Sequence, residues 1–336
     1  MNNYEVIMSE LRDKIINLKN HMEERIVGQE DLVKKLLITM LAGGHALVEG
    51  APGLAKTKAI KTLADSVNAD FSRIQFTPDL LPSDITGSDI YVASAGKFEF
   101  RRGPIFANFV LADEINRAPA KVQSALLEAM AEWQVSVGGK RYELPELFMV
   151  LATQNPIEHE GTYNLPEAQL DRFLLYIKID QPDAKTEKKI LELVRAEDKA
   201  GSGEVSVKQE LEKAFAKLDI AEILAARREV LDVYTSEAVE QYLIQLIMAT
   251  RKPEKYNGEL AGAVRFGASP RATIALDKCA KINAWLEGRD FVTPEDIQAV
   301  VYDVLRHRII LSFEAQAEGV TADNVIGSLL KAVPLP

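Results

Sequence analysis

The sequence predicts an α/β fold, in which a parallel sheet is flanked by helices and is followed by a smaller helical region. An apolar run at residues 45–48 leads through a Gly-rich turn into a segment with helical periodicity at 57–67. Further apolar runs of strand length alternate with helical patterns through the first half of the chain. At Gln181-Pro182-Asp183 the strand pattern stops and helical periodicity takes over. This change predicts an α/β core over residues 1–182 and a helical lid domain over 183–336.

The composition is that of a globular protein with a full hydrophobic core, since 47% of the 336 residues are hydrophobic and 27% are charged. The length suggests about two domains, at roughly 100–200 residues each. The net charge is −10, from 40 basic and 50 acidic residues. Phosphate neutralisation needs a basic surface. We therefore expect no nucleic-acid partner, although a local basic patch stays open.

Cysteine, histidine and the first residues narrow the chemistry further. The single cysteine, Cys279, excludes an internal disulfide and any multi-cysteine metal site. The four histidines lie far apart with no i, i+4 pair, so we expect no zinc site. The N-terminus lacks a charged leader before an apolar core, and no run of about 18 apolar residues occurs. We expect no signal peptide, no membrane span and a cytoplasmic location.

A Gly-rich loop lies between the first strand and the helix that follows it. Its sequence is Gly50-Ala51-Pro52-Gly53-Leu54-Ala55-Lys56-Thr57. Backbone N–H groups of such a turn and of the helix N-terminus point at one spot, where the helix dipole also favours an anion. Lys56 can reach the outer phosphates of a nucleotide, and the Thr57 hydroxyl can bind Mg²⁺. We therefore predict a site for ATP and Mg²⁺ formed by Gly50, Pro52, Gly53, Leu54, Ala55, Lys56 and Thr57.

Two helices are expected ahead of this loop. Apolar residues spaced by 3 and 4 predict an amphipathic helix over residues 4–24, and a second helix covers 31–41. The Val27-Gly28 pair between them has two interpretations. It is a turn that leads into the second helix, or its backbone lines an adenine pocket beside the loop.

Two adjacent carboxylates, Asp113 and Glu114, end an apolar strand at residues 109–114. The carboxyl ends of parallel strands meet at one edge of the sheet, where ligands bind. An Asp at that edge can hold the water shell of Mg²⁺, and Glu114 would polarise the attacking water. The alternative is an ordinary polar strand end.

Two excursions interrupt the alternation of strands and helices. Residues 77–87 contain two prolines and a glycine and are expected to be largely loop, with short β-like pieces over 91–100. Alternation on both sides of Gly138-Gly139 predicts a β-hairpin. Each excursion is either a plain surface feature or a loop presented to a partner or to a central pore.

Asn155 and Arg172 each allow a structural and a functional interpretation. Asn155 follows a strand predicted at 147–153, where it is a turn residue before a proline or a hydrogen-bond donor to the γ-phosphate or the attacking water. Arg172 is a surface arginine paired with Asp171, worth about 0–1 kcal/mol. Alternatively, its planar guanidinium stabilises transition-state charge on a neighbouring subunit's nucleotide.

Arg271 stands on the first turn of a predicted helix, with Ser269 as its N-cap and Pro270 at its first position. The helix dipole is positive there, so a cation is poorly placed for stability. A phosphate contact explains the arginine better.

The rest of the chain gives elements of ordinary length. They are strands at 71–76 and 174–179, and helices at 120–132, 186–200, 237–251, 272–287, 297–309 and 314–330. No internal repeat or low-complexity segment is visible.

Taken in order and spacing, these motifs resemble those of the AAA+ ATPases, and within them the MoxR family. The marks more particular to that family are Ala55-Lys56-Thr57, Gly103-Pro104-Ile105-Phe106, Asp113-Glu114-Ile115-Asn116-Arg117-Ala118-Pro119, Ala152-Thr153-Gln154-Asn155-Pro156, Leu165-Pro166-Glu167-Ala168-Gln169-Leu170-Asp171-Arg172-Phe173 and Ser269-Pro270-Arg271. Ala55 stands where most such loops have glycine, and MoxR-like proteins commonly have alanine there. A methyl group is tolerable if that residue has a helix-like φ.

The resemblance covers essentially the whole chain, and it implies a P-loop core with five parallel strands in the order 5-1-4-3-2 and a smaller all-helical lid. It also implies a hexameric ring with nucleotide between subunits. The segment before Phe106 matches the extra helix-2 insertion of this branch. The Gly138-Gly139 ribbon matches its hairpin ahead of the first sensor.

The family's pattern also gives a role to each candidate residue. Nucleotide and metal binding fall to Val27, Gly28, the loop residues with Lys56 and Thr57, and Asp113. The catalytic roles are the base Glu114, the first sensor Asn155, the arginine finger Arg172 and the second sensor Arg271.

The function that this resemblance implies is that of an ATP-driven chaperone that remodels or matures partner complexes. In the family the partner is often a protein with a von Willebrand factor type A domain or a metal-dependent enzyme. Three rivals stay open. They are a metal-chelatase-type motor subunit, a nucleic-acid-remodelling motor, against which the acidic charge counts, and a scaffold that barely turns ATP over, against which Glu114 counts.

Overall fold

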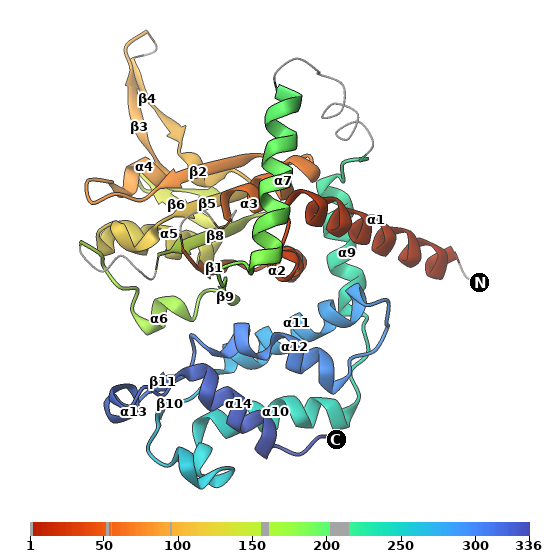
Figure 1. The fold of residues 1–336 in the computed structure, drawn as a ribbon. Helices are drawn as coiled ribbons and strands as arrows, with labels where there is room; N and C mark the ends of the chain where they lie inside the picture. The colour runs from red at the N-terminus through yellow and green to blue at the C-terminus, as the bar shows by residue number, and fades with distance from the viewer. Residues whose placement is uncertain (1–2, 52–53, 55, 95, 156–160, 202–214) are drawn as a thin grey trace.

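The computed structural model describes residues 3–51, 54, 56–94, 96–155, 161–201 and 215–336. Its centre is a five-stranded parallel sheet (Figure 1). The strands are β1 (Ala46–Glu49), β2 (Phe71–Gln75), β5 (Phe109–Asp113), β8 (Met149–Gln154) and β9 (Leu175–Lys178). They lie in the order β2-β5-β8-β1-β9. Counted along the chain this is 5-1-4-3-2 read from the β9 edge, so the predicted strand order is confirmed.

The sheet is covered on both faces, as the apolar runs of its central strands require. Successive side chains of a strand point to opposite faces. Phe109 and Leu111 of β5 accordingly pack into one buried cluster, and Val110 and Ala112 into another. The first cluster holds α1 (Asn3–Arg25), α2 (Glu30–Ala42) and α3 (Lys56–Ser66), and the second holds α5 (Ala120–Glu132).

Two antiparallel hairpins extend the core. One pairs β3 (Gly87–Val92) with β4 (Lys97–Arg102) and projects away from the sheet in Figure 1. The other pairs β6 (Gln134–Val137) with β7 (Lys140–Glu143), and its turn residues Gly138 and Gly139 have positive φ, as predicted. The first hairpin touches the second, because a Cβ on Gly138 would lie 2.3 Å from Asp89 Oδ2.

The segment before the β3–β4 hairpin is more regular than expected. Residues 77–87 were predicted to be largely loop, yet Pro82–Thr86 form a helical turn, α4. Pro82 occupies the first helical position, where its missing N–H costs no hydrogen bond. The Asp84 carboxylate accepts a hydrogen bond from the Leu81 N–H at 2.8 Å and closes the start of the turn.

The second region is mostly helical. Its helices are α7 (Ala184–Gly201), α9 (Ile220–Leu231), α10 (Glu237–Arg251), α11 (Pro270–Leu286), α12 (Pro294–Leu305), α13 (Phe313–Ala317) and α14 (Ala322–Ala332). A two-stranded sheet of β10 (Val264–Phe266) and β11 (Ile310–Leu311) joins them. In Figure 1, α7 lies beside the sheet, whereas α10 to α14 form a separate layer. The predicted domain boundary at 182 stays a prediction, since one hydrophobic cluster includes residues of both regions.

Two helix predictions near the C-terminus were wrong. The helix expected over 314–330 is two helices, α13 and α14, because Gly319 adopts a φ of +79° and Thr321 caps a new helix by accepting from the Asn324 N–H. The helix expected to reach residue 309 ends at Leu305, and Ile310 already pairs in β11. Among the described residues, none of the helices has the length and apolar character needed to span a bilayer.

The buried His45, just before β1, stabilises the core in its neutral form. Its Nδ1 accepts from the Val150 N–H at 3.0 Å, and its Nε2–H faces the Met130 carbonyl at 3.2 Å. Trp133 and Phe148 pack against the ring. Burial lowers the pKa of His45 to about 4.

This lowered pKa predicts a loss of stability in acid. Between pH 6.5 and about 4 the unfolded chain takes up a proton on His45 and the folded chain does not, so the free energy of unfolding falls as the pH falls. At about 1.4 kcal/mol per tenfold change in proton affinity, the loss is roughly 3 kcal/mol. Urea unfolding of the native chain and His45→Gln at pH 7.5 and pH 4.5 measures it. Between these two pH values, the free energy of unfolding of His45→Gln should fall by roughly 3 kcal/mol less than that of the native chain. Equal falls would contradict the lowered pKa of His45.

Candidate active site

The Gly-rich loop follows β1, an interior strand of the sheet that lies between β8 and the edge strand β9. The Gly50 N–H donates to the Gln154 carbonyl at 3.3 Å, which fixes the start of the loop against the end of β8. Pro52, Gly53 and Ala55 lie outside the described residues, so the predicted shape of the loop stays a prediction. Leu54 packs near Gly50, since a Cβ at Gly50 would lie 3.3 Å from its Cδ1.

Lys56 and Thr57 start α3, which follows the loop as predicted. The Lys56 ammonium donates to the Gly50 carbonyl at 2.7 Å. Burial lowers the pKa of Lys56, while the negative charges of Asp113 and Glu114 oppose that shift. The amine is therefore a desolvated cation that lies within electrostatic range of both carboxylates. Such a group is placed to receive an anion.

Asp113 ends β5 and is held on both carboxylate oxygens. Its Oδ1 accepts from the Thr153 hydroxyl at 2.7 Å. Its Oδ2 accepts from Arg73 of β2 at 2.6 Å through one nitrogen and at 3.1 Å through another. The carboxylate thus has a fixed orientation at the carboxyl edge of the sheet.

Glu114 follows directly, with a φ of +56° that is unusual for a residue other than glycine. Its N–H donates to the Thr153 hydroxyl at 2.9 Å, so that hydroxyl joins both acidic residues. Its Oε2 accepts from Gln75 at 2.8 Å and lies 3.1 Å from Arg117 Nε. A left-handed backbone of this kind costs about 1–3 kcal/mol and is maintained mainly where the surroundings or function require it.

Asn155 completes this edge of the sheet. Glu49 of β1 and Gln154 of β8 are register partners, so Gly50 and Asn155 leave neighbouring strands side by side. Asn155 is buried. The structure thus brings Gly50, Lys56, Asp113 and Asn155 to one edge, as the strand-end pattern predicted.

Val27 and Gly28 form a half-buried turn between α1 and α2. Gly28 has a φ of +77°, and a Cβ there would lie 2.0 Å from the Thr186 methyl group of α7. Glycine is therefore required by both backbone and packing. The geometry bears out a turn before α2, and the adenine pocket stays a prediction.

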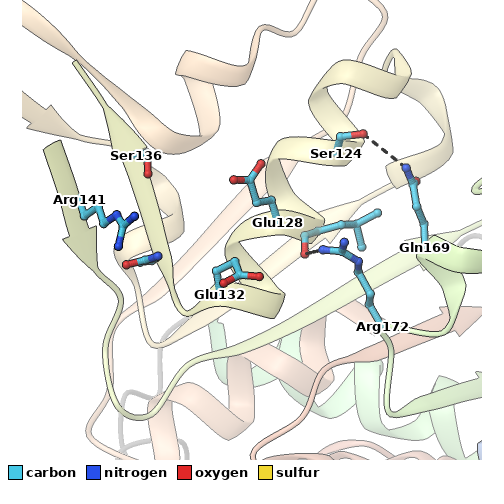
Figure 2. Close-up of a pocket in the computed structure, with 9 residues that line it drawn as sticks. Ser124, Glu128, Glu132, Ser136, Arg141, Gln169 and Arg172 are labelled. Carbon is cyan, nitrogen blue, oxygen red and sulfur yellow. Dashed lines mark hydrogen bonds between the residues drawn. The ribbon is translucent and has the colours of Figure 1, made fainter. Parts of the chain in front are cut away.

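Arg172 lies apart from this edge, beside a pocket of about 460 Å³ on the α5 side. The lining residues are Ser124, Leu127, Glu128, Glu132, Gln134, Ser136, Arg141, Gln169 and Arg172 (Figure 2). The Nη1 of Arg172 donates to the Leu127 carbonyl at 2.6 Å. The predicted alternative, a pair with Asp171, is wrong, because Asp171 pairs with Arg308 at 2.8 Å. None of the pocket-lining residues belongs to the Gly-rich loop or to the β5 carboxylates.

Arg271 occupies the first turn of α11, as predicted. The Ser269 hydroxyl accepts from its N–H at 3.2 Å and caps the helix, with Pro270 at the first position. Its side chain is 61% exposed and lies 3.7 Å from Asp171. The largely exposed side chain thus lies at the start of α11 and faces the Asp171 carboxylate.

Sequence reasoning missed Arg73, Gln75 and Thr153. The first two share one face of β2, two residues apart, and Thr153 lies near the end of β8, two residues before Asn155. Polar side chains at alternate positions near the end of a strand were the available signal. Their role follows from the strand register, because Gln75 of β2 and Asp113 of β5 are partners in the parallel sheet. The sequence alone does not give that register.

Two sequence profiles match the chain over these regions. The profile of the "ATPase family associated with various cellular activities (AAA)" matches residues 45–175, and that of the "AAA lid domain" matches residues 260–329. The sheet order, the strand-end carboxylates and the helical second region therefore define an AAA-type ATPase core with its lid.

Closer relatives identify the branch. "Chaperone MoxR1" of Mycobacterium tuberculosis is 45% identical over 93% of this chain and 79% of its own length. "Uncharacterized protein YeaC" of Bacillus subtilis is 44% identical over 94% and 93%. The crystal structure of a candidate ATPase from Cytophaga hutchinsonii superposes with a TM-score of 0.88 at 44% identity, over 99% of this chain and 98% of that one. The chain belongs to the MoxR family of AAA+ ATPases, which confirms the resemblance.

Proposed function

We propose that the chain is an ATP-hydrolysing chaperone of the MoxR type that acts as a hexameric ring in the cytoplasm. Its clients are partner complexes that it remodels or matures. These clients include proteins with a von Willebrand factor type A domain or metal-dependent enzymes. The observation that carries the proposal is the arrangement of Lys56, Asp113 and Asn155 at the carboxyl edge of the sheet, where the Lys56 ammonium donates to the Gly50 carbonyl at 2.7 Å. A relative that is 45% identical bears the name chaperone.

The residues at the edge of the sheet fit a Mg²⁺ ion bound together with nucleotide phosphates. The Asp113 carboxylate and the Thr57 hydroxyl supply hard oxygen atoms, which Mg²⁺ prefers. In the part of the chain that the structure describes, no group of three or more His, Cys, Asp or Glu side chains is arranged to hold a metal. That fits an ion held by one or two protein groups, with phosphates and water as its other ligands. Bound there, Mg²⁺ would neutralise charge on the phosphates.

The chain's own residues divide the remaining work. Lys56 would hold the outer phosphates, and Glu114 would accept the proton of the attacking water. Gln75 and Arg117 orient the Glu114 carboxylate. Asn155 would hold the γ-phosphate or the water, and Arg271 would approach from the lid. Val27 and Gly28 would line the adenine.

Hydrolysis assays test the class of function. We expect the purified protein to hydrolyse ATP in the presence of Mg²⁺ and to show the same turnover with added DNA or RNA. Stimulation by nucleic acid would favour the nucleic-acid motor instead. Absence of turnover in assembled rings would favour the scaffold. Insertion of a metal into a cofactor by a reconstituted complex would favour the chelatase-type motor.

Arg172 is predicted to act on the nucleotide of a neighbouring subunit. Arg172→Ala rings should lose turnover by roughly 10³-fold, the contribution of an arginine finger. Mixing them with Lys56→Ala subunits should restore part of it, because the latter keep Arg172 beside an intact neighbouring site. Steady-state ATPase measurements over a series of mixing ratios check this.

Arg141→Ala is the matched control, since Arg141 lines the same pocket but lies on the β7 hairpin. It should retain turnover. If mixtures of Arg172→Ala and Lys56→Ala show only the sum of their separate activities, either Arg172 does not act in trans or the subunits do not form mixed rings.

A further inference from the structure

The segment that carries Arg172 is held by a buried arginine of the second region, Arg308, whose side chain is only 3% exposed. Its Nε donates to Asp171 Oδ1 at 2.8 Å. Its Nη2 donates to the Phe173 carbonyl at 2.7 Å, and its Nη1 to the Leu174 carbonyl at 3.1 Å. One guanidinium thus binds the residues on both sides of Arg172.

The same Asp171 carboxylate also faces the start of α11. Its Oδ2 accepts from the Ser269 hydroxyl at 3.1 Å and lies 3.7 Å from Arg271 Nη1. Ser269 caps α11, so Asp171 is bonded to the helix start that presents Arg271. The Asp171 carboxylate therefore binds both Arg308 and the start of the helix that carries Arg271, and Asp171 itself is the neighbour of Arg172 in the sequence.

The geometry of this joint is rigid. Five N–H groups in a fixed plane make Arg308 a two-sided clamp, which lysine cannot reproduce. His307 adds a contact from its Nε2 to the Phe173 carbonyl at 3.1 Å, and Phe173 is fully buried. Truncating one partner of such a buried pair leaves the other charge uncompensated. These bonds connect the lid directly to the Arg172 segment, so a lid movement that keeps them would also displace that segment.

We propose that Asp171 and Arg308 are positioning residues that fix Arg172 to the lid, so that one clamp sets both Arg271 in its own site and Arg172 in the neighbouring subunit's site. The proposal rests on the proposed function, because it assumes that Arg172 acts in trans. Neither residue touches the nucleotide in this proposal. Their effect passes through the placement of the two arginines.

A mixed-ring assay distinguishes a failure of the clamp from a failure of the trans role of Arg172. The acceptor subunit carries Arg172→Ala and keeps its own nucleotide site. The donor subunit carries Lys56→Ala and supplies Arg172. A second donor carries Lys56→Ala with Asp171→Asn, which keeps the shape of Asp171 but loses its charge. We expect the first donor to restore turnover and the second to restore roughly tenfold less, since misplacement of a catalytic group by about 1 Å can cost 10²-fold.

Asp296→Asn in the donor is the matched control. Asp296 is a buried lid carboxylate that also pairs with an arginine, Arg289 at 2.6 Å, and its partners lie outside the Arg172 segment. The donor with Lys56→Ala and Asp296→Asn should restore turnover to the same extent as the donor with Lys56→Ala alone, even where its melting temperature is lower. A general loss of lid stability would instead impair both asparagine donors alike.

Arg308→Lys provides a second donor if Asp171→Asn does not fold. It retains a cation beside Asp171 but cannot also bind the Phe173 and Leu174 carbonyls, so it too should restore less turnover. Full restoration by both Asp171→Asn and Arg308→Lys donors overturns the clamp. No restoration by the Lys56→Ala donor overturns the trans role of Arg172, and with it the proposed function of that residue.

Discussion

Replacing Lys56 with alanine should abolish binding of ATP at concentrations that saturate the native protein. Lys56 is the partly buried cation at the start of α3, and its ammonium donates to the Gly50 carbonyl of the Gly-rich loop at 2.7 Å. Without its ammonium group, the phosphates would meet two carboxylates with less positive charge nearby. Charge-assisted hydrogen bonds contribute about 1.5–3 kcal/mol each. Loss of two such bonds corresponds to at least roughly 100-fold in affinity, at about 1.4 kcal/mol for each factor of ten.

Titration with a fluorescent ATP analogue measures this loss. Lys61→Ala is the matched control, because Lys61 lies on the same helix with its side chain exposed. Its affinity should stay within about twofold of the native value, because water and salt screen the charge of an exposed side chain. Equal affinities for Lys56→Ala and Lys61→Ala would remove Lys56 from the phosphate site.

The strand-end residues of this site were predictable because topology brings them together irrespective of detail. Asp113 and Asn155 each follow an apolar run of strand length. Parallel strands present their carboxyl ends at one edge. That argument needs no knowledge of side-chain conformation. It placed the two residues correctly before the sheet was known.

The residues that orient these groups were not predictable in the same way. Arg73 of β2 donates to Asp113 at the end of the neighbouring strand β5, and the two residues are 40 positions apart in the sequence. Arg308 reaches Asp171 across 137 positions. Neither pair has a local pattern, because a charged residue on a strand or after a helix is ordinary until its partner is placed. Long-range ion pairs depend on tertiary packing, which periodicity does not encode.

The C-terminal helices show the same limit at short range. An apolar period continues from α13 into α14, so one helix was expected. Gly319 and the Thr321 cap interrupt it. Glycine at a left-handed φ and a threonine cap are both recognisable signals, and periodicity alone outweighed them.

Replacing Glu114 with glutamine should leave ATP binding intact and slow hydrolysis by roughly 10²–10⁴-fold, the contribution of a general base. The exchange is conservative in shape. The amide oxygen can still accept from Gln75, and the Glu114 N–H bond to Thr153 is unaffected. The change also removes the ionic part of the exposed contact with Arg117, which is worth about 0–1 kcal/mol. What the variant loses is the ability to take a proton from water at neutral pH.

Single-turnover hydrolysis and ATP titration, performed on the same preparation, separate the two effects. Glu318→Gln makes the same chemical change on an exposed residue of the lid and should hydrolyse ATP at the native rate. A parallel loss of binding in Glu114→Gln would mean that the carboxylate organises the nucleotide site rather than the reaction. Native turnover in Glu114→Gln would assign the base to another group, and the left-handed backbone at this position would then need a different explanation.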